Sequence, residues 1–160
     1  MNIFIFDVDD TLILHNQETN DYYNTYNDGE LSKLVKTINV DHIYIYTNGT
    51  YSHGYGIVKN LLLNNIIPVN NIFGRDNNKY MKPDIRSYNN INEIINNRIS
   101  NKTKKIYFFD DLIENLVTAK QIGWKTIWIS PDFVDKPHYI DYAFPNIFQA
   151  LMYFTEIILF

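Results

Sequence analysis

The chain has 160 residues, of which 46% are hydrophobic and 20% are charged. This length and balance predict one soluble globular domain with a sizeable core and argue against wholesale disorder. The 14 basic and 18 acidic residues give a formal net charge of -4, which disfavours nonspecific nucleic-acid binding, and the lack of cysteine excludes disulfides, thiolate metal sites and cysteine nucleophiles.

Short runs of β-branched and aromatic residues alternate with longer segments of helical period, which is typical of an α/β domain with a parallel sheet. Nearly continuous apolar runs indicate strands that helices cover on both faces. The expected strands are Asn2–Phe6, His42–Tyr46, Asn71–Phe73, Lys104–Phe109, Lys125–Ile129 and Tyr142–Phe144. The expected helices are Gly29–Ile38, Ser52–Asn64, Asp84–Arg98, Ile113–Ile122 and Asn146–Ile157. No repeat and no flexible linker divides the sequence, so we expect residues 1–160 to form a single domain.

The segment 12–28 is polar and aromatic and has no clear period. We expect it to form a loop or hairpin, here called the flap, that stands over a binding site. Its tyrosines Tyr22, Tyr23 and Tyr26 could stack on an aromatic substrate. Ordinary packing of a short flap is the favoured interpretation.

The two ends of the sequence indicate where the protein acts. The first residues lack the basic segment of a secretory signal, so a cytoplasmic protein is expected. The apolar stretch from Ile147 to Phe160 is interrupted by Gln149 and Glu156 and is shorter than the ~20 residues of a membrane span. It therefore predicts a packed C-terminal helix and no membrane partner.

Acidic and hydroxyl residues follow three of the predicted strands. They are Asp7, Asp9, Asp10 and Thr11 after the first strand, Thr47 and Asn48 after the second, and Asp110 and Asp111 after Lys104–Phe109. Ligands of parallel α/β sheets bind at the carboxyl ends of strands. Paired acids at that edge repel each other unless a cation lies between them, and hard oxygen ligands suit Mg²⁺. Lys82 offers the opposite charge that a substrate phosphate needs, so the set indicates phosphoryl chemistry.

The segments FIFDVDDTL, YIYTNG, MKPD and IYFFDDLIEN match, in order and spacing, the four motifs of the haloacid dehalogenase-like (HAD) hydrolases. The sequence therefore resembles this superfamily over essentially its whole length. The stretch FFDDLIENLVTAKQIGWKTIWIS, followed by IDYAFPNIFQAL, is most similar to the pyrimidine 5'-nucleotidase-like branch. Thr11 and Thr47 are only 36 positions apart, so the helical cap of that branch does not fit. The resemblance implies a Rossmann-like, three-layer, capless domain with the flap as its only lid.

The resemblance also implies roles for the residues of the first and last motifs. Asp7 corresponds to the nucleophile and a metal ligand. Asp9 corresponds to the general acid and base, and its backbone carbonyl to a metal ligand. Asp111 corresponds to the direct Mg²⁺ ligand, and Asp110 to a neighbour that acts through water. Asn115 matches a polar position that braces this loop, whereas Leu112 departs from the small hydroxyl residue common after the acid pair.

In the second and third motifs, Thr47 and the backbone N–H of Asn48 correspond to groups that hold the phosphoryl oxygens. Lys82 corresponds to the residue that balances their charge. The histidines show no ligand spacing and are interpreted as surface or core residues. His15 and His53 lie near the expected mouth of the site, and either could touch substrate. The histidines are His15, His42, His53 and His138.

The expected function is that of an Mg²⁺-dependent phosphatase that hydrolyses a phosphomonoester through an aspartyl-phosphate. The substrate could be a nucleotide or another small molecule, or a macromolecule such as a phosphoprotein; nucleic-acid ends are possible but not favoured. The alternative from another class is a catalytically weak, phosphate-binding interaction module, which the unusual Leu112 and the missing cap would suit.

Overall fold

The computed structural model describes residues 1–23, 29–100, 103–132 and 135–158. Its centre is a six-stranded sheet in the order β5-β4-β1-β6-β7-β8, and every neighbouring pair is parallel. The strands are β1 Asn2–Phe6, β4 His42–Tyr46, β5 Ile72–Phe73, β6 Lys105–Asp110, β7 Lys125–Ile129 and β8 Tyr142–Phe144. The predicted parallel α/β sheet is confirmed. Only β5 and β6 differ from their expected bounds: β5 begins one residue later, and β6 begins and ends one residue later.

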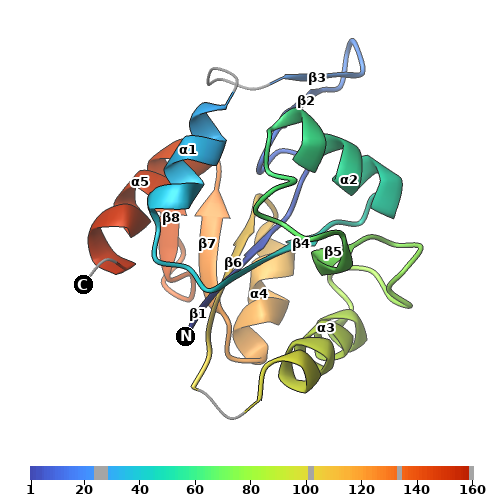
Figure 1. The fold of residues 1–160 in the computed structure, drawn as a ribbon. Coiled ribbons are helices and arrows are strands. Elements are labelled where there is room, and N and C mark those ends of the chain that lie inside the picture. Colours follow the sequence, from blue (N-terminus) through green and yellow to red (C-terminus); the bar gives the residue numbers. More distant parts are fainter. Residues whose placement is uncertain (24–28, 101–102, 133–134, 159–160) are drawn as a thin grey trace.

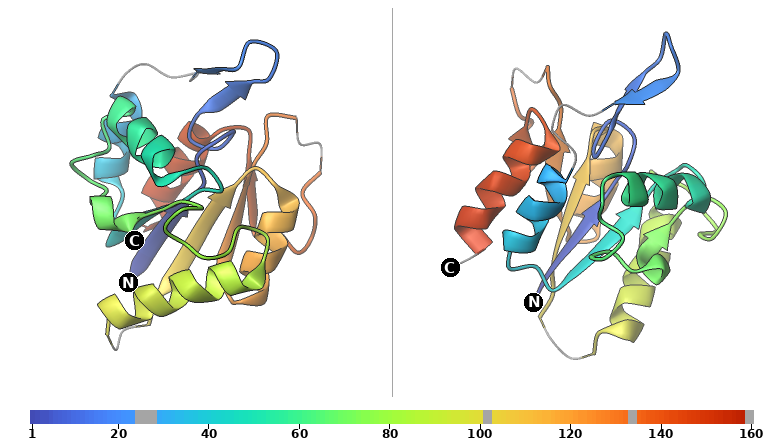
Figure 2. Two further views of the ribbon diagram at one scale, coloured as in Figure 1. Left: turned by 90° about the vertical axis from the view of Figure 1, so that its right-hand side faces the viewer. Right: turned by 45° about the horizontal axis from the view of Figure 1, so that its top comes forward.

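Helices cover both faces of this sheet and give a three-layer, Rossmann-like architecture (Figure 1). The helices are α1 Glu30–Thr37, α2 Tyr51–Asn60, α3 Ile85–Arg98, α4 Ile113–Gln121 and α5 Ile147–Ile158, with a short 3₁₀ turn, η1, at Val69–Asn71. Helices α1 and α5 pack together over one face, and α3 and α4 over the other (Figures 1 and 2).

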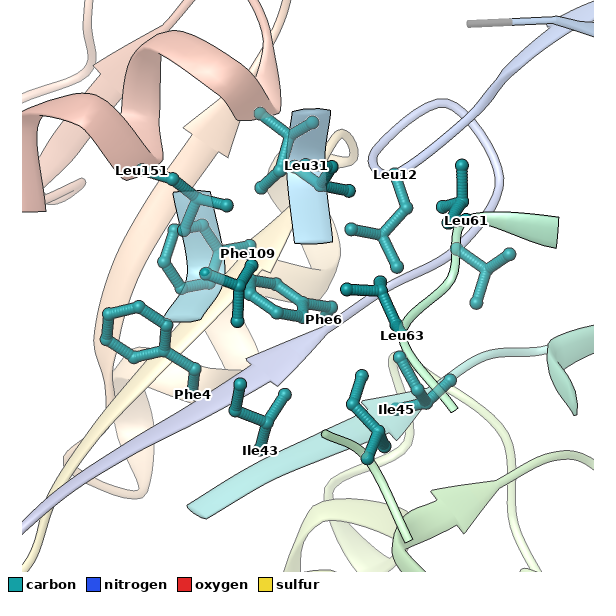
Figure 3. Packing of buried hydrophobic residues seen from close by; sticks show 14 of the residues in the cluster. Phe4, Phe6, Leu12, Leu31, Ile43, Ile45, Leu61, Leu63, Phe109 and Leu151 are labelled. Carbon is teal, nitrogen blue, oxygen red and sulfur yellow. The ribbon is translucent and has the colours of Figure 1, made fainter. Parts of the chain in front are cut away.

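The alternation of side chains along β1 divides the core into two halves. Phe4 and Phe6 point to the layer of α1 and α5, whereas Ile3 and Ile5 point to the layer of α3 and α4. All four side chains are fully buried. Figure 3 shows the first half, in which the phenylalanines of β1 meet Phe109 of β6 and leucines from both α1 and α5. Burial on both faces is the reason that these strands are continuously apolar.

Helix α2 ends at Asn60, so the expected helix Ser52–Asn64 was predicted too long. Leu62 takes a left-handed backbone conformation, with φ 57°. The amide of Leu63 then bonds the carbonyl of Val58 at 2.9 Å, which closes the helix with a Schellman-type turn. Such turns usually contain glycine, whereas the leucine run here extends the apolar pattern past the true end.

The flap contains a β-hairpin. Strands β2 (Leu14–Asn16) and β3 (Asp21–Tyr23) pair in antiparallel fashion and project beyond the carboxyl end of the sheet (Figures 1 and 2). The side chain of Asn16 accepts hydrogen bonds from the amides of Glu18 and Thr19 and so stabilises the turn. Residues 24–28 of the predicted flap, including Tyr26, lie outside the described residues. The described residues between β1 and β4 form this hairpin and α1, and no cap domain.

The C-terminal segment forms α5, a packed helix as expected. Its residues Ala150, Leu151 and Phe154 are buried in the core. Among the described helices, none has the length and apolar character that crossing a membrane requires.

Candidate active site

Three adjacent strands deliver the predicted site residues to one edge of the sheet. Because β1 lies between β4 and β6, the residues that follow these strands are neighbours. Asp7 continues the ladder after β1 through a bond from its amide to the carbonyl of Phe109, at 2.9 Å. Beyond it, the carbonyl of Val8 accepts from three successive amides, and Asp10 has φ 59°. This tight turn sends the chain into the flap.

Lys82 joins the three strand ends. Its Nζ atom donates to Oδ1 of Asp7 at 2.8 Å, to Oδ2 of Asp110 at 2.8 Å and to the carbonyl of Tyr46 at 2.9 Å. The side chain is buried. Although burial disfavours the charged form, the carboxylates of Asp110 and Asp7 raise the pKa of Lys82 above its usual value. Lys82 is therefore a fixed cation at the centre of the site.

Three carboxylates lie close together at this edge of the sheet, and Lys82 forms ion pairs with two of them, Asp7 and Asp110. Asp7, Asp110 and Asp111 each place an oxygen atom within 4.8 Å of the others. Burial, followed by the charges of Asp7 and Asp110, raises the pKa of Asp111 to about 8. Burial and the charge of Asp7 likewise raise the pKa of Asp110 to about 6, against the opposing effect of Lys82. A cluster of hard oxygen ligands with excess negative charge fits a divalent cation such as Mg²⁺.

The two acids after β6 have different surroundings. Asp110 is fully buried and accepts from Lys82, from the amide of Leu112 and, with both oxygens, from Nδ2 of Asn115. The expected bracing role of Asn115 is thereby confirmed. Asp111 is only partly buried, and Trp128 holds its backbone carbonyl at 3.0 Å. Asp110 is thus saturated by protein donors, while Asp111 is the acid nearer to solvent.

The loop after β4 is tied to the loop that carries Lys82. The Asn48 side chain donates to the carbonyl of Lys82 and accepts from its amide, both at 2.9 Å. Thr47 is buried, and its hydroxyl accepts from the amide of Gly49 at 3.0 Å. These bonds fix the position of the predicted phosphate-binding residues relative to one another.

The carboxylate of Asp9 is turned toward α2. Its Oδ1 atom lies 2.8 Å from Nε2 of His53, in the first turn of that helix. The side chain of Asp9 is 37% exposed, whereas Asp7 is buried. Asp9 is therefore more accessible than Asp7 to solvent or to a leaving group.

A cavity of about 290 Å³ opens beside these acids. It is lined by Asp10, Leu14, Tyr23, Asp111, Ile129, Ser130 and Pro131. One wall comes from the flap and the opposite wall from the loop after β7, so the cavity lies next to the carboxylate cluster and under the hairpin.

Several solved structures share this fold. No family model matches the sequence, and the comparison with curated proteins found no match. A candidate β-phosphoglucomutase from Thermotoga maritima superposes with a TM-score of 0.66 at 13% identity, covering 98% of this chain and 100% of that one. YfnB, a candidate HAD hydrolase of Bacillus subtilis solved with magnesium, gives 0.60 at 20% identity, covering 79% and 54%. A HAD-superfamily hydrolase from Ehrlichia chaffeensis gives 0.60 at 18%, covering 90% and 63%.

The chain has the HAD fold. It spans about half the length of YfnB and of the dehalogenases that it also matches. Within the HAD fold, the residues singled out from the sequence gather at the carboxyl edge of the sheet, as predicted. They are Asp7, Asp9, Thr47, Asn48, Lys82, Asp110 and Asp111.

The sequence patterns assign no specific role to two polar residues that contact the predicted acids in the structure. Thr11 donates its hydroxyl proton to Oδ2 of Asp7 at 3.0 Å. His53, for which the sequence favours a surface or core position, bonds Asp9 across 44 positions of sequence. A clue was available for Thr11, because it stands only four residues after Asp7.

Proposed function

We propose that this protein is a metal-dependent phosphatase that hydrolyses a phosphomonoester through an aspartyl-phosphate at Asp7. One observation carries the proposal. The carboxylate of Asp7 is held by Lys82 and Thr11 at the edge of the sheet where Asp110 and Asp111 also converge. A fixed carboxylate next to a fixed cation and further metal-type ligands suits attack on a phosphoryl group, because phosphoryl transfer depends on positioning and charge stabilisation.

The oxygen-rich cluster would hold Mg²⁺ through Asp7, Asp111 and the backbone carbonyl of Asp9. When bound, the cation would neutralise charge on the phosphoryl oxygens. The saturation of Asp110 by Lys82, Leu112 and Asn115 supports a role in orienting its neighbours rather than direct ligation.

In the first half of the reaction, an oxygen of Asp7 attacks phosphorus while the bond to the leaving oxygen breaks. Protonated Asp9 gives its proton to that oxygen, so that the product leaves as an alcohol. Lys82, Thr47 and the amide of Asn48 stabilise the phosphoryl oxygens during the transfer.

In the second half, Asp9 takes a proton from water as the water oxygen attacks phosphorus. The bond between phosphorus and Asp7 breaks, phosphate is released, and both carboxyl groups return to their starting forms. The partial exposure of Asp9 suits this role, because the group must meet both leaving group and water.

The cavity under the flap would receive the leaving group. Its size and mixed polar and apolar lining suit a compact organic group, so we favour a small-molecule phosphomonoester, with nucleotides among the candidates. A phosphoprotein or a nucleic-acid end, which an open, capless site could also admit, is the alternative substrate.

Purified protein would be assayed with Mg²⁺ against a panel of phosphomonoesters, with phosphate release as the readout. Chloride release from a 2-chloro acid would be measured in parallel, because the structures that share the fold include dehalogenases. We expect phosphate release that Asp7→Asn abolishes. Phosphate binding without turnover would instead support the interaction module, and halide release would support a dehalogenase.

A further inference from the structure

A histidine outside the four motifs contacts the carboxylate of Asp9. Nε2 of His53 lies 2.8 Å from Oδ1 of Asp9, and the side chain of His53 is 26% exposed. The backbone of His53 is itself fixed, because its amide donates to Oγ1 of the N-cap residue Thr50 at 3.1 Å. The imidazole therefore reaches Asp9 from a rigid helix terminus.

The flap packs a ring against the same imidazole. The ring centroids of Tyr22 and His53 are 5.1 Å apart, and those of Tyr22 and His15 are 4.8 Å apart. His15 is itself linked to the loop of the first motif, because its amide donates to Oδ1 of Asp10 at 3.0 Å. A continuous row of rings thus runs from the base of the flap to His53.

The two faces of the hairpin have separate neighbours. His15 and Tyr22 are opposed in the β2–β3 register, and their rings contact each other at a tilt, as do those of Tyr22 and His53. The next opposed pair, Leu14 and Tyr23, lines the cavity beside Asp111. Because successive strand residues point to opposite faces, one side of the flap can support His53 while the other meets the leaving group.

The loop after β4 leaves room for the imidazole. A Cβ atom at position 49 would lie 3.0 Å from Cδ2 of His53, which is tighter than nine in ten real Cβ contacts. Gly49, Tyr22 and Asp9 therefore confine the ring on three sides.

We propose that His53 is a positioning residue for Asp9, and that Tyr22 of the flap supports His53 in this role. With Nε2 as the donor, the bond occupies Oδ1 of Asp9 and leaves Oδ2 free to exchange a proton with the leaving group and with water. A partly exposed carboxylate without such a partner samples several rotamers, which lowers the fraction of time it spends in reach of the reacting oxygen. This inference rests on the proposed phosphatase function.

The test compares the full-length wild type with His53→Gln, His53→Asn and Tyr22→Ala, and uses His138→Asn as a control at an exposed histidine. The amide nitrogen of Gln extends about as far as Nε2 of histidine, whereas that of Asn does not. Each protein is mixed with Mg²⁺ and an aryl phosphate, quenched with acid and weighed by intact-mass spectrometry, and phosphate release is followed in steady state.

We expect His53→Asn to slow phosphate release by about 10- to 100-fold, which is the cost of misplacing a catalytic group. The variant should also accumulate phosphoenzyme, because dephosphorylation needs Asp9 whereas loss of an acidic aryl leaving group does not. His53→Gln should recover most of the rate, and Tyr22→Ala should show a smaller slowing of the same kind. A merely structural defect would lower activity without phosphoenzyme.

Unchanged turnover in His53→Asn, or lost turnover without accumulated phosphoenzyme, would overturn the positioning role while leaving the phosphatase function standing. Absence of phosphate release from the wild type on every substrate would instead overturn the proposed function and this inference with it.

Discussion

Nζ of Lys82 lies 2.8 Å from Oδ1 of Asp7, and the lysine side chain is 1% exposed. The same ammonium group also forms an ion pair with Asp110, so Lys82→Met would leave two carboxylates without their cation. Removing one partner of a buried ion pair typically costs about 3–5 kcal/mol, and we expect a loss of that order in the free energy of unfolding. Denaturant unfolding of the metal-free protein measures it.

The control for this prediction is Lys33→Met, a change at an exposed lysine of α1. It should alter the free energy of unfolding by no more than about 0.5 kcal/mol. The double variant Lys82→Met/Asp110→Asn should be less destabilised than the sum of its single changes, because it leaves one fewer uncompensated charge. Strict additivity would show that the lysine does not act through this ion pair.

Removing metal should abolish activity and lower stability. Excess chelator should stop phosphate release, and added Mg²⁺ should restore it and raise the melting temperature, because a ligand that binds only the folded state stabilises it. Asp111→Asn should lose the melting-temperature increase, whereas Asp135→Asn, at an exposed aspartate, should keep it. Full activity in excess chelator would contradict the metal site.

The stability of the metal-free protein should fall as pH rises. Burial and the neighbouring carboxylates raise the pKa of Asp111 from 3.8 to about 8. Between these values the folded protein holds a proton that the unfolded chain has released, so the free energy of unfolding decreases with pH across this window. In chelator, the melting temperature of Asp111→Asn should therefore rise relative to that of the wild type as the pH increases from 5 to 9. A constant difference between the two proteins would contradict the shift.

The sheet and its acidic edge could be predicted from the sequence because both depend on local patterns. Continuous apolar runs such as Asn2–Phe6 are enough to define doubly covered strands, and the acids come directly after them. The end of α2 could not be predicted, because a leucine at position 62 occupies a conformation that usually needs glycine. The pairing of Asp9 with His53 depends on how α2 packs against the first motif, and residue spacing carries no record of that contact.

The flap should govern substrate preference through Tyr23. This side chain is 49% exposed and lines the cavity beside Asp111. Tyr23→Ala should raise KM for phosphomonoesters with bulky leaving groups while changing kcat on a small phosphomonoester little, since a tyrosine in the cavity wall would touch the leaving group and not phosphorus. A matched series of substrates of increasing size measures this. An equal loss on all of them would mean that the flap belongs to the catalytic machinery.

The last prediction separates the nucleophile from the acid and base. Asp7→Asn should prevent any phosphoenzyme, because an amide is a poor nucleophile and a weaker metal ligand. Asp9→Asn keeps the nucleophile but removes the group that activates water, so dephosphorylation should slow by roughly 10²–10⁴-fold. With an aryl phosphate, whose leaving group needs little protonation, this variant should accumulate phosphate on Asp7. Intact-mass measurement after acid quench, followed by peptide mapping, locates the group. Phosphate on a serine or histidine, or equal labelling of Asp7→Asn, would refute the mechanism.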